Sequence, residues 1–108
     1  MNQEAVIVIG VLSIPIHLHG LGSIKDKRKI VKSLVERLRS RFNASVSEID
    51  ALDNKRLGII AVAVVSNEGR FVEEQLDTIV RFIQQDGRFF PGQIQREIFS
   101  ANHDLPQL

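Results

Sequence analysis

The chain has 108 residues, no Cys, and 14 basic against 13 acidic side chains, which gives a formal net charge of +1. That length accommodates one ordinary domain and is too short for two. Without Cys, the sequence excludes a disulfide scaffold, a thiolate nucleophile and thiolate-ligated zinc or iron–sulfur sites.

Residues 6–18 are predicted to form a long strand. The first half of this segment is apolar on both faces, which is typical of a central strand that is buried on both sides. Pro15 has no N–H to donate, so strand pairing should loosen near it. Because Ser13, Pro15 and His17 interrupt the apolar run, we expect neither a signal peptide nor a membrane span, and we expect a cytoplasmic protein.

Residues 23–42 are predicted to form a helix with an apolar face. Ser23 is placed to cap its start, and Asp26 three residues later resembles the second half of a capping box. Between Ser23 and Asn43, eight basic side chains meet two acidic ones, so this segment carries +6 and the remainder of the chain −5. Such segregated charge is informative about partners rather than about the fold.

The rest of the chain alternates between strand and helix patterns. Residues 57–65 contain no polar side chain and are rich in Ile and Val, which predicts a second central strand. Around it we predict a polar edge strand at 44–52, a turn at 53–56, a helix at 71–85, a connection at 89–92, a partly polar strand at 93–100 and a frayed tail at 101–108.

The resulting order is β-α-β-β-α-β, and its simplest packing is the ferredoxin-like α+β sandwich. Right-handed crossovers then place both helices on one face of a four-stranded antiparallel sheet with strand order 4-1-3-2. That order makes the two most apolar strands central, so the hydrophobic pattern and the topology agree. We therefore expect one ferredoxin-like domain over residues 1–100, followed by a C-terminal tail over 101–108.

Two helices on one face leave the other face of the sheet open. Monomers seldom expose apolar patches of more than a few hundred Å², and symmetric dimers are the commonest assemblies that cover them. We therefore expect a homodimer that packs through this face. The predicted interface residues are Ile7, Ile9, Val11, Ile60, Val62 and Val64. The alternative is that the Phe89-Phe90 connection or the C-terminal tail covers the face.

Cations crowd the beginning of the predicted helix 23–42. Lys25, Lys27 and Arg28 lie in its first turn and a half, where each opposes the helix dipole at a cost of about 0.3–1 kcal/mol at low salt. Backbone N–H groups near Gly22 and Ser23 would help to bind an anion there, which would relieve the conflict. The predicted anion or nucleic-acid site comprises Gly22, Ser23, Lys25, Lys27, Arg28, Lys29, Lys32 and Arg39. A solvated charged face is the alternative interpretation.

No other constellation of residues indicates a reaction. His17 and His19 form a His-x-His pair at a strand end, but no carboxylate lies nearby in the sequence to complete a metal site. Glu48 and Asp50 are expected to share one face of an edge strand, where carboxylates more often discourage aggregation than catalyse. We therefore predict no catalytic residue, no metal, no cofactor and no enzyme activity.

If nucleic acid is the anionic partner, we expect binding through charge rather than base stacking. A ferredoxin-like RNA-recognition domain needs aromatic side chains on its central strands, and the predicted strands at 6–18 and 57–65 contain none. The expectation is a non-enzymatic RNA- or ribosome-associated protein whose first helix contacts phosphate with strong salt dependence. The alternative is a small homo-oligomeric module that binds an anionic metabolite at the start of that helix.

Several motifs resemble the YlxP-like family of small bacterial proteins of unknown function. They are Ser23-Ile24-Lys25-Asp26-Lys27-Arg28, then Arg37, then Asn43-Ala44-Ser45 followed by Glu48-Ile49-Asp50, and later Ser66-Asn67. The similarity spans about residues 6–85 and implies a ferredoxin-like fold. Members of the family are commonly encoded beside translation and ribosome-maturation genes, which implies a role linked to RNA or the ribosome. The chain departs from the family at 52–56, where the family's Trp is missing, and matches it least over 89–108.

Overall fold

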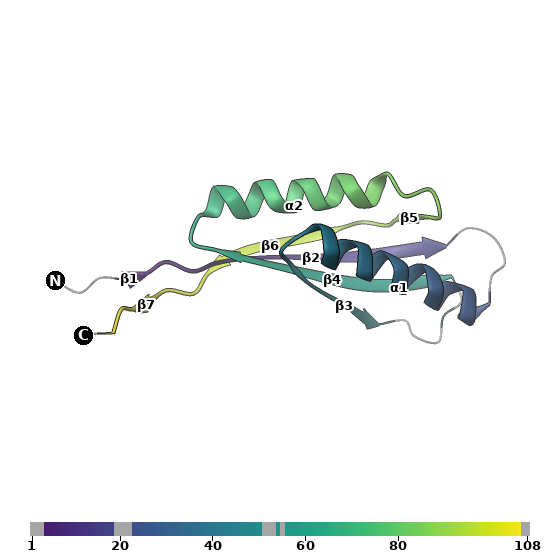
Figure 1. The fold of residues 1–108 in the computed structure, drawn as a ribbon, viewed down its shortest axis with the longest axis horizontal. Helices are drawn as coiled ribbons and strands as arrows, with labels where there is room; N and C mark the ends of the chain where they lie inside the picture. Colours follow the sequence, from purple (N-terminus) through teal and green to yellow (C-terminus); the bar gives the residue numbers. More distant parts are fainter. Residues whose placement is uncertain (1–3, 19–22, 51–53, 55, 107–108) are drawn as a thin grey trace.

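The computed structural model describes residues 4–18, 23–50, 54 and 56–106. Two helices cover one face of an antiparallel sheet, and a short two-stranded ribbon extends from one end (Figure 1). The helices are α1 (Ile24–Arg41) and α2 (Gly69–Gln84), and within this described part of the chain neither is long and apolar enough to cross a membrane. The strands are β1 (Glu4–Ala5), β2 (Val8–Leu18), β3 (Ser45–Asp50), β4 (Leu57–Ser66), β5 (Phe89–Pro91), β6 (Gln95–Ser100) and β7 (His103–Asp104).

The central strands of the main sheet are β2 and β4. The strand order is β3-β4-β2-β5, β6 also pairs with β2, and every pairing is antiparallel. The short strands β5 and β6 therefore share one position at the edge of the sheet, where a single fourth strand is predicted. The α+β class and the predicted order 4-1-3-2 are confirmed. Residues 89–91 are part of the sheet and not a connection, contrary to the sequence prediction.

The outer strand is interrupted opposite Pro15. Strand β5 pairs with β2 as far as Ile16, and β6 resumes the pairing at Ser13. The carbonyl oxygen of Pro15 accepts a hydrogen bond from the N–H of Gly92 at 2.9 Å, so the proline nitrogen faces the same edge. Because that nitrogen carries no proton, the ladder is broken there, whereas the pairing with β4 continues through Pro15. The predicted loosening is thus confirmed on one side of the strand.

Both helices pack on the same face of the sheet, as two glycines show. A Cβ atom built on Gly10 of β2 would lie 2.5 Å from a methyl of Val72 in α2. A Cβ atom built on Gly58 of β4 would lie 3.3 Å from a methyl of Val31 in α1. The register places Gly10 and Gly58 in the same alternate set of residues, so α1 and α2 cover one face and the hydrophobic core lies between them and the sheet.

The alternation along β4 places Ile60, Val62 and Val64 in this core, where each is at most 2% exposed. The prediction that these three residues line the open face is therefore wrong. A strand that is apolar on both faces carries no signal for which alternate set turns toward the helices. The residues of β4 on the open face are instead Leu57, Ile59, Ala61, Ala63 and Val65.

The open face of β2 matches the prediction better. Ile9 pairs with Val65 and Val11 pairs with Ala63, and both β2 residues are half-buried. Ile7 is also half-buried and lies just before the strand.

The two ends of the described chain lie side by side in the ribbon formed by β1 and β7 (Figure 1). Two hydrogen bonds anchor its base: Ala101 N–H donates to the Ile7 carbonyl at 2.8 Å, and Ile7 N–H donates to Asn102 Oδ1 at 3.2 Å. The Cα radius of gyration is 16.5 Å, against about 13 Å for a compact chain of this length. Residues 103–104 are paired in this ribbon rather than frayed. In the described structure the ribbon extends beyond the sheet, and β5 lies at the sheet edge, where only the ring of Phe90 reaches one end of the open face.

Candidate nucleic-acid interface

A capping box closes the start of α1. The N–H of Ser23 donates to Asp26 Oδ2 at 3.3 Å, and the N–H of Asp26 donates to Ser23 Oγ at 3.1 Å. The predicted cap is confirmed, and it changes the predicted anion site. The Asp26 carboxylate already occupies the N–H of Ser23 and supplies negative charge where the helix dipole favours it. Gly22, the other predicted backbone donor, lies outside the described residues.

Lys27 is buried, contrary to the prediction that it contacts phosphate. Its side chain is 0% exposed, and its Nζ donates to the carbonyl oxygen of Leu57 at 3.3 Å at the start of β4. Lys27 lies four residues before Val31 and eleven before Leu38, so it shares the face of α1 that packs on the sheet. The net charge of +6 counted for residues 23–43 therefore includes one cation, Lys27, that is buried and that a partner cannot contact.

The other four cations at the beginning of α1 are exposed. This set, here called the basic cluster, comprises Lys25, Arg28, Lys29 and Lys32. Among the described residues, none of the four forms an ion pair. They occupy the N-terminal half of the helix, where the dipole disfavours positive charge.

Some of the other cations are held by carboxylates. Within the described part of the chain, four ion pairs with N···O distances of 2.6–3.2 Å join Arg37 to Asp86, Arg88 to Asp86, Arg70 to Glu74 and Arg96 to Asp77. The basic cluster differs from these four arginines because it gathers four cations without carboxylate partners on one half of one helix.

Arg39 does not belong with the basic cluster, although the sequence assigns it to the same site. Its Nη2 donates to the carbonyl oxygen of Val46 at 2.6 Å. Among the described strands β3 pairs with β4 alone, so this carbonyl lies at the edge of the sheet. The guanidinium group of Arg39 thus covers part of an otherwise unpaired strand edge, which is a common protection against edge-to-edge association.

A groove of about 360 Å³ lies between the basic cluster and β3. Val31 and Val35 give it an apolar floor, and Arg28, Lys32 and Glu48 flank it. The sequence does not predict this groove, because it depends on how α1 crosses the edge strand. The only available signal is the spacing of 28, 32 and 35, which places a charged and an apolar row side by side on one helix.

The remaining candidates from the sequence do not form reactive sites. The ring of His17 stacks on Phe90, with centroids 5.1 Å apart and planes 12° apart, and His19 lies outside the described residues. Glu48 pairs with Ile60, but a bulge shifts the register so that Asp50 pairs with Ile59. The regular alternation on which that prediction depends is therefore interrupted between positions 48 and 50.

A perturbed carboxyl group lies at the end of α2. The side chain of Asp86 is 6% exposed and accepts hydrogen bonds from Arg88 Nη2 at 2.7 Å and Arg37 Nη1 at 3.2 Å. The hydrogen bond from Arg88 holds the pKa of Asp86 below its usual 3.8, although burial acts in the opposite direction. Arg88 also donates to Ser33 Oγ of α1 at 3.1 Å, so this network joins the two helices.

Comparisons with known proteins agree with the motifs in the sequence. A family model described as a protein of unknown function (DUF503) matches residues 9–94. The uncharacterized protein YlxP of Bacillus subtilis (strain 168) is 32% identical over 81 residues, which cover 75% of this chain and 83% of that protein. The resemblance to YlxP-like proteins is confirmed, and the chain belongs to the DUF503 family of proteins of unknown function.

Proposed function

We propose that this chain is a non-enzymatic RNA- or ribosome-associated protein that binds the phosphate backbone through the basic cluster of α1. The observation that carries the proposal is the basic cluster itself, in which four exposed cations share one side of a helix and have no carboxylate partner among the described residues. Clustered and unpaired cations on one helix face are the electrostatic signature of a polyanion site.

The geometry of the cluster suits a backbone rather than a base sequence. Lys25, Lys29 and Lys32 follow each other at helical spacing and span about 10 Å along one side of α1. Lysine ammonium groups act as point charges that position phosphate without reading bases. Arg28 and Lys32 also flank the groove above Val31 and Val35, so a strand bound along α1 would pass beside an apolar surface.

The alternative, an anionic metabolite at the start of α1, fits less well. The capping box already fills the N–H of Ser23 with the carboxylate of Asp26, and burial removes Lys27 from that corner. A small anion would therefore have to compete with a carboxylate of the chain itself.

The proposal extends to the setting in which the protein works. We infer that the fold belongs to the ferredoxin-like class. Right-handed crossover connections in a β-α-β-β-α-β chain give this strand order and place both helices on one face of the antiparallel sheet. We further propose a cytoplasmic homodimer that associates through the open face of the sheet, because its exposed apolar residues need a covering surface.

Salt titration of RNA binding tests the function. Four phosphate contacts by the cluster predict a log–log slope of about −3 for a short oligouridine, at about 0.7 per contact. The double variant Lys29→Gln/Lys32→Gln should reduce the steepness by about 1.4 and weaken binding at low salt. The matched control Arg70→Gln/Arg81→Gln removes the same charge from α2 and should leave the slope unchanged.

Two results would contradict the proposal. One is a wild-type slope near zero, which would mean that no phosphate contact forms. The other is an equal loss in both double variants, which would mean that net charge rather than the basic cluster attracts RNA.

A further inference from the structure

One end of the open sheet face carries a row of exposed and half-buried apolar side chains. The register places Val65 of β4, Ile9 of β2 and Phe99 of β6 side by side in this row. Val65 is 64% exposed and Phe99 is 42% exposed. Phe99 therefore projects from one edge of the sheet as a large apolar side chain.

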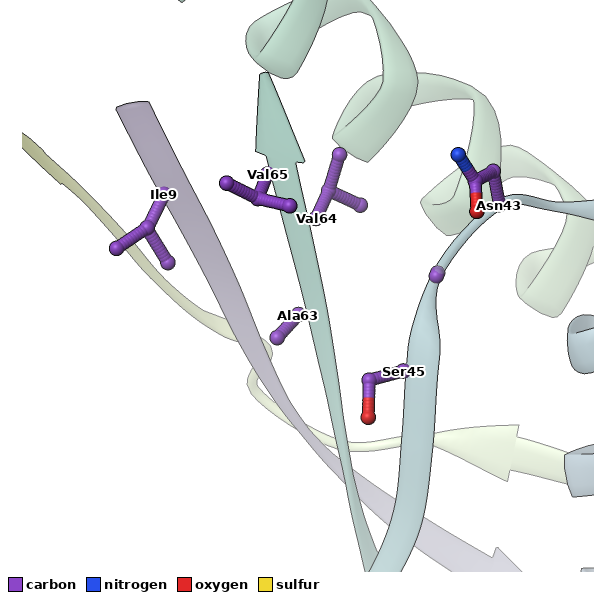
Figure 2. Close-up of a pocket in the computed structure, with 7 residues that line it drawn as sticks. Ile9, Asn43, Ser45, Ala63, Val64 and Val65 are labelled. Carbon is purple, nitrogen blue, oxygen red and sulfur yellow. The ribbon is translucent and has the colours of Figure 1, made fainter. Parts of the chain in front are cut away.

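The same end of the face contains a hollow of about 190 Å³, which lies on the side of Val65 that faces β3. Ile9, Val65 and Ala63 lie on neighbouring strands along it, and Ser45 follows on β3 (Figure 2). The hollow exists because Ala44, Ser45 and Ala63 have small side chains, whereas the other apolar residues that line it, Ile9, Val64 and Val65, are β-branched. An apolar cavity of about 150 Å³ is enough to bind benzene, so this hollow has the size of one phenyl ring.

A two-fold axis brings the side chain and the hollow together. When two copies stack these faces with the axis parallel to the strands, each copy's β6 edge lies over the other's β3 edge, at the same height along the strands. We propose that the chain forms a symmetric dimer in which Phe99 of each copy inserts into the other's hollow, where Ala63 and Val65 of β4 adjoin Ser45 of β3. This inference rests on the self-association proposed above and adds the residues that specify it. Such a contact is reciprocal, as a two-fold interface requires.

The neighbouring rows are complementary under the same axis. Val11 faces the partner's Ala63, so apolar meets apolar. Glu97 faces the partner's Ser45, and Gln95 faces the partner's Ser47, so acceptors meet hydroxyl donors at both edges. The face thus combines an apolar centre with polar edges, which is the usual anatomy of an interface.

The size of the face is sufficient for a stable dimer. The central strands β2 and β4 contribute ten paired residues each, β3 contributes six and the β5–β6 edge nine. At about 3.3 Å by 4.8 Å per residue, the face measures roughly 550 Å² per copy. Two such faces bury about 1,100 Å², which exceeds the roughly 1,000 Å² that a specific interface needs. Phe90, at the other end of the face, is less suited to act as the inserted group because its ring already stacks on His17.

Sedimentation equilibrium of the full chain with three variants tests the dimer. The chain has a mass of 12.2 kDa, so the wild type should sediment at twice this value. Phe99→Ser removes the inserted ring and Ala63→Leu fills the hollow, and each should raise the dimer dissociation constant at least 100-fold. Phe90→Ser removes a ring from the same face and should leave the constant within about threefold of wild type.

Mixing the two disruptive variants gives the sharpest test. A Phe99→Ser copy keeps its hollow and an Ala63→Leu copy keeps its ring, so a mixed dimer retains one of the two insertions while each pure dimer retains none. The mixture should therefore contain heterodimer, which native mass spectrometry resolves, and circular dichroism of each variant checks that it is folded.

Three results would overturn the inference. They are a monomeric wild type at high micromolar concentration, a Phe99→Ser variant that dimerises like wild type, and a loss of dimer in Phe90→Ser alone. The last result would indicate the other two-fold axis, perpendicular to the strands, which stacks Phe99 over the partner's Phe90. Because the basic cluster lies on α1, RNA binding by a Phe99→Ser monomer separates failure of this dimer from failure of the proposed function.

Discussion

Lys27 Nζ donates a hydrogen bond to the carbonyl oxygen of Leu57 at 3.3 Å, and no part of the lysine side chain is exposed. The contact joins the first turn of α1 to the beginning of β4. A basic residue in the middle of a basic segment is therefore part of the packing between helix and sheet. Its neighbours Arg28 and Lys29 point outward and remain accessible.

This difference predicts opposite effects for two adjacent lysines. Lys27→Met keeps most of the side-chain volume but leaves the Leu57 carbonyl without this donor, so it should lower the free energy of unfolding by about 1–3 kcal/mol. The same variant should leave the salt slope of RNA binding unchanged. Lys29→Gln should leave stability within about 0.5 kcal/mol of wild type and reduce the steepness of the slope by about 0.7.

Urea unfolding and the salt titration measure the two effects independently. If Lys27→Met reduced the slope as much as Lys29→Gln, then Lys27 would reach the bound phosphate and the buried position would not describe the binding state.

The sequence predicts the fold well where one local rule decides it. The alternation along β2, the apolar run of β4 and the capping box at Ser23 and Asp26 each depend on residues close together in the chain, and all three are observed. The order of the strands follows from topology rules that leave few alternatives. Pro15 also has a local consequence, because its missing N–H interrupts the adjacent strand wherever the chain places it.

The features that the sequence does not predict depend on relations between distant segments. Whether Val64 or Val65 faces the helices cannot be decided within a strand that is apolar on both sides. The bulge between Glu48 and Asp50 depends on the partner strand. For the candidate site, helical spacing finds the basic cluster but assigns Lys27 to the surface, although its distance from Val31 and Leu38 already indicates the buried face.

Asp86 gives a prediction with a defined pH dependence. Its pKa is lowered in the folded protein, chiefly by the hydrogen bond from Arg88, whereas in the unfolded chain it should titrate near 3.8. The resulting stability is therefore fully present above about pH 5 and is lost as the pH falls through the lower folded value. Asp86→Asn should lower the free energy of unfolding by about 1–3 kcal/mol at pH 7, and this gap should shrink below pH 4.

Unfolding in urea at a series of pH values measures the gap, and Glu74→Gln serves as the matched control. Glu74 also pairs with an arginine, but the side chains of Arg70 and Glu74 are 90% and 65% exposed, so its loss should cost only about 0.5 kcal/mol. A gap for Asp86→Asn that stayed constant down to pH 3 would mean that the carboxylate charge does not contribute to the network.

Gly10 predicts how closely α2 approaches the sheet. A Cβ atom there would lie 2.5 Å from Val72 Cγ1 and 2.8 Å from Leu76 Cδ1. The Leu76 methyl is at the end of a flexible side chain, but Val72 is branched at Cβ and has little rotamer freedom in a helix. Gly10→Ala should therefore push α2 outward and lower the free energy of unfolding by about 1–3 kcal/mol. Gly87→Ala, which would meet no atom within 4 Å, is the control and should not be destabilising.

A second-site change distinguishes this clash from a loss of backbone freedom. Val72→Ala removes the methyl that a Cβ at position 10 would meet, so Gly10→Ala/Val72→Ala should be more stable than the sum of the two single changes predicts. A double-mutant cycle from thermal or urea unfolding gives this coupling, which we expect to exceed about 0.5 kcal/mol. Strict additivity would show that α2 and β2 are not in the close contact that positions both helices, and with them the basic cluster, on one face of the sheet.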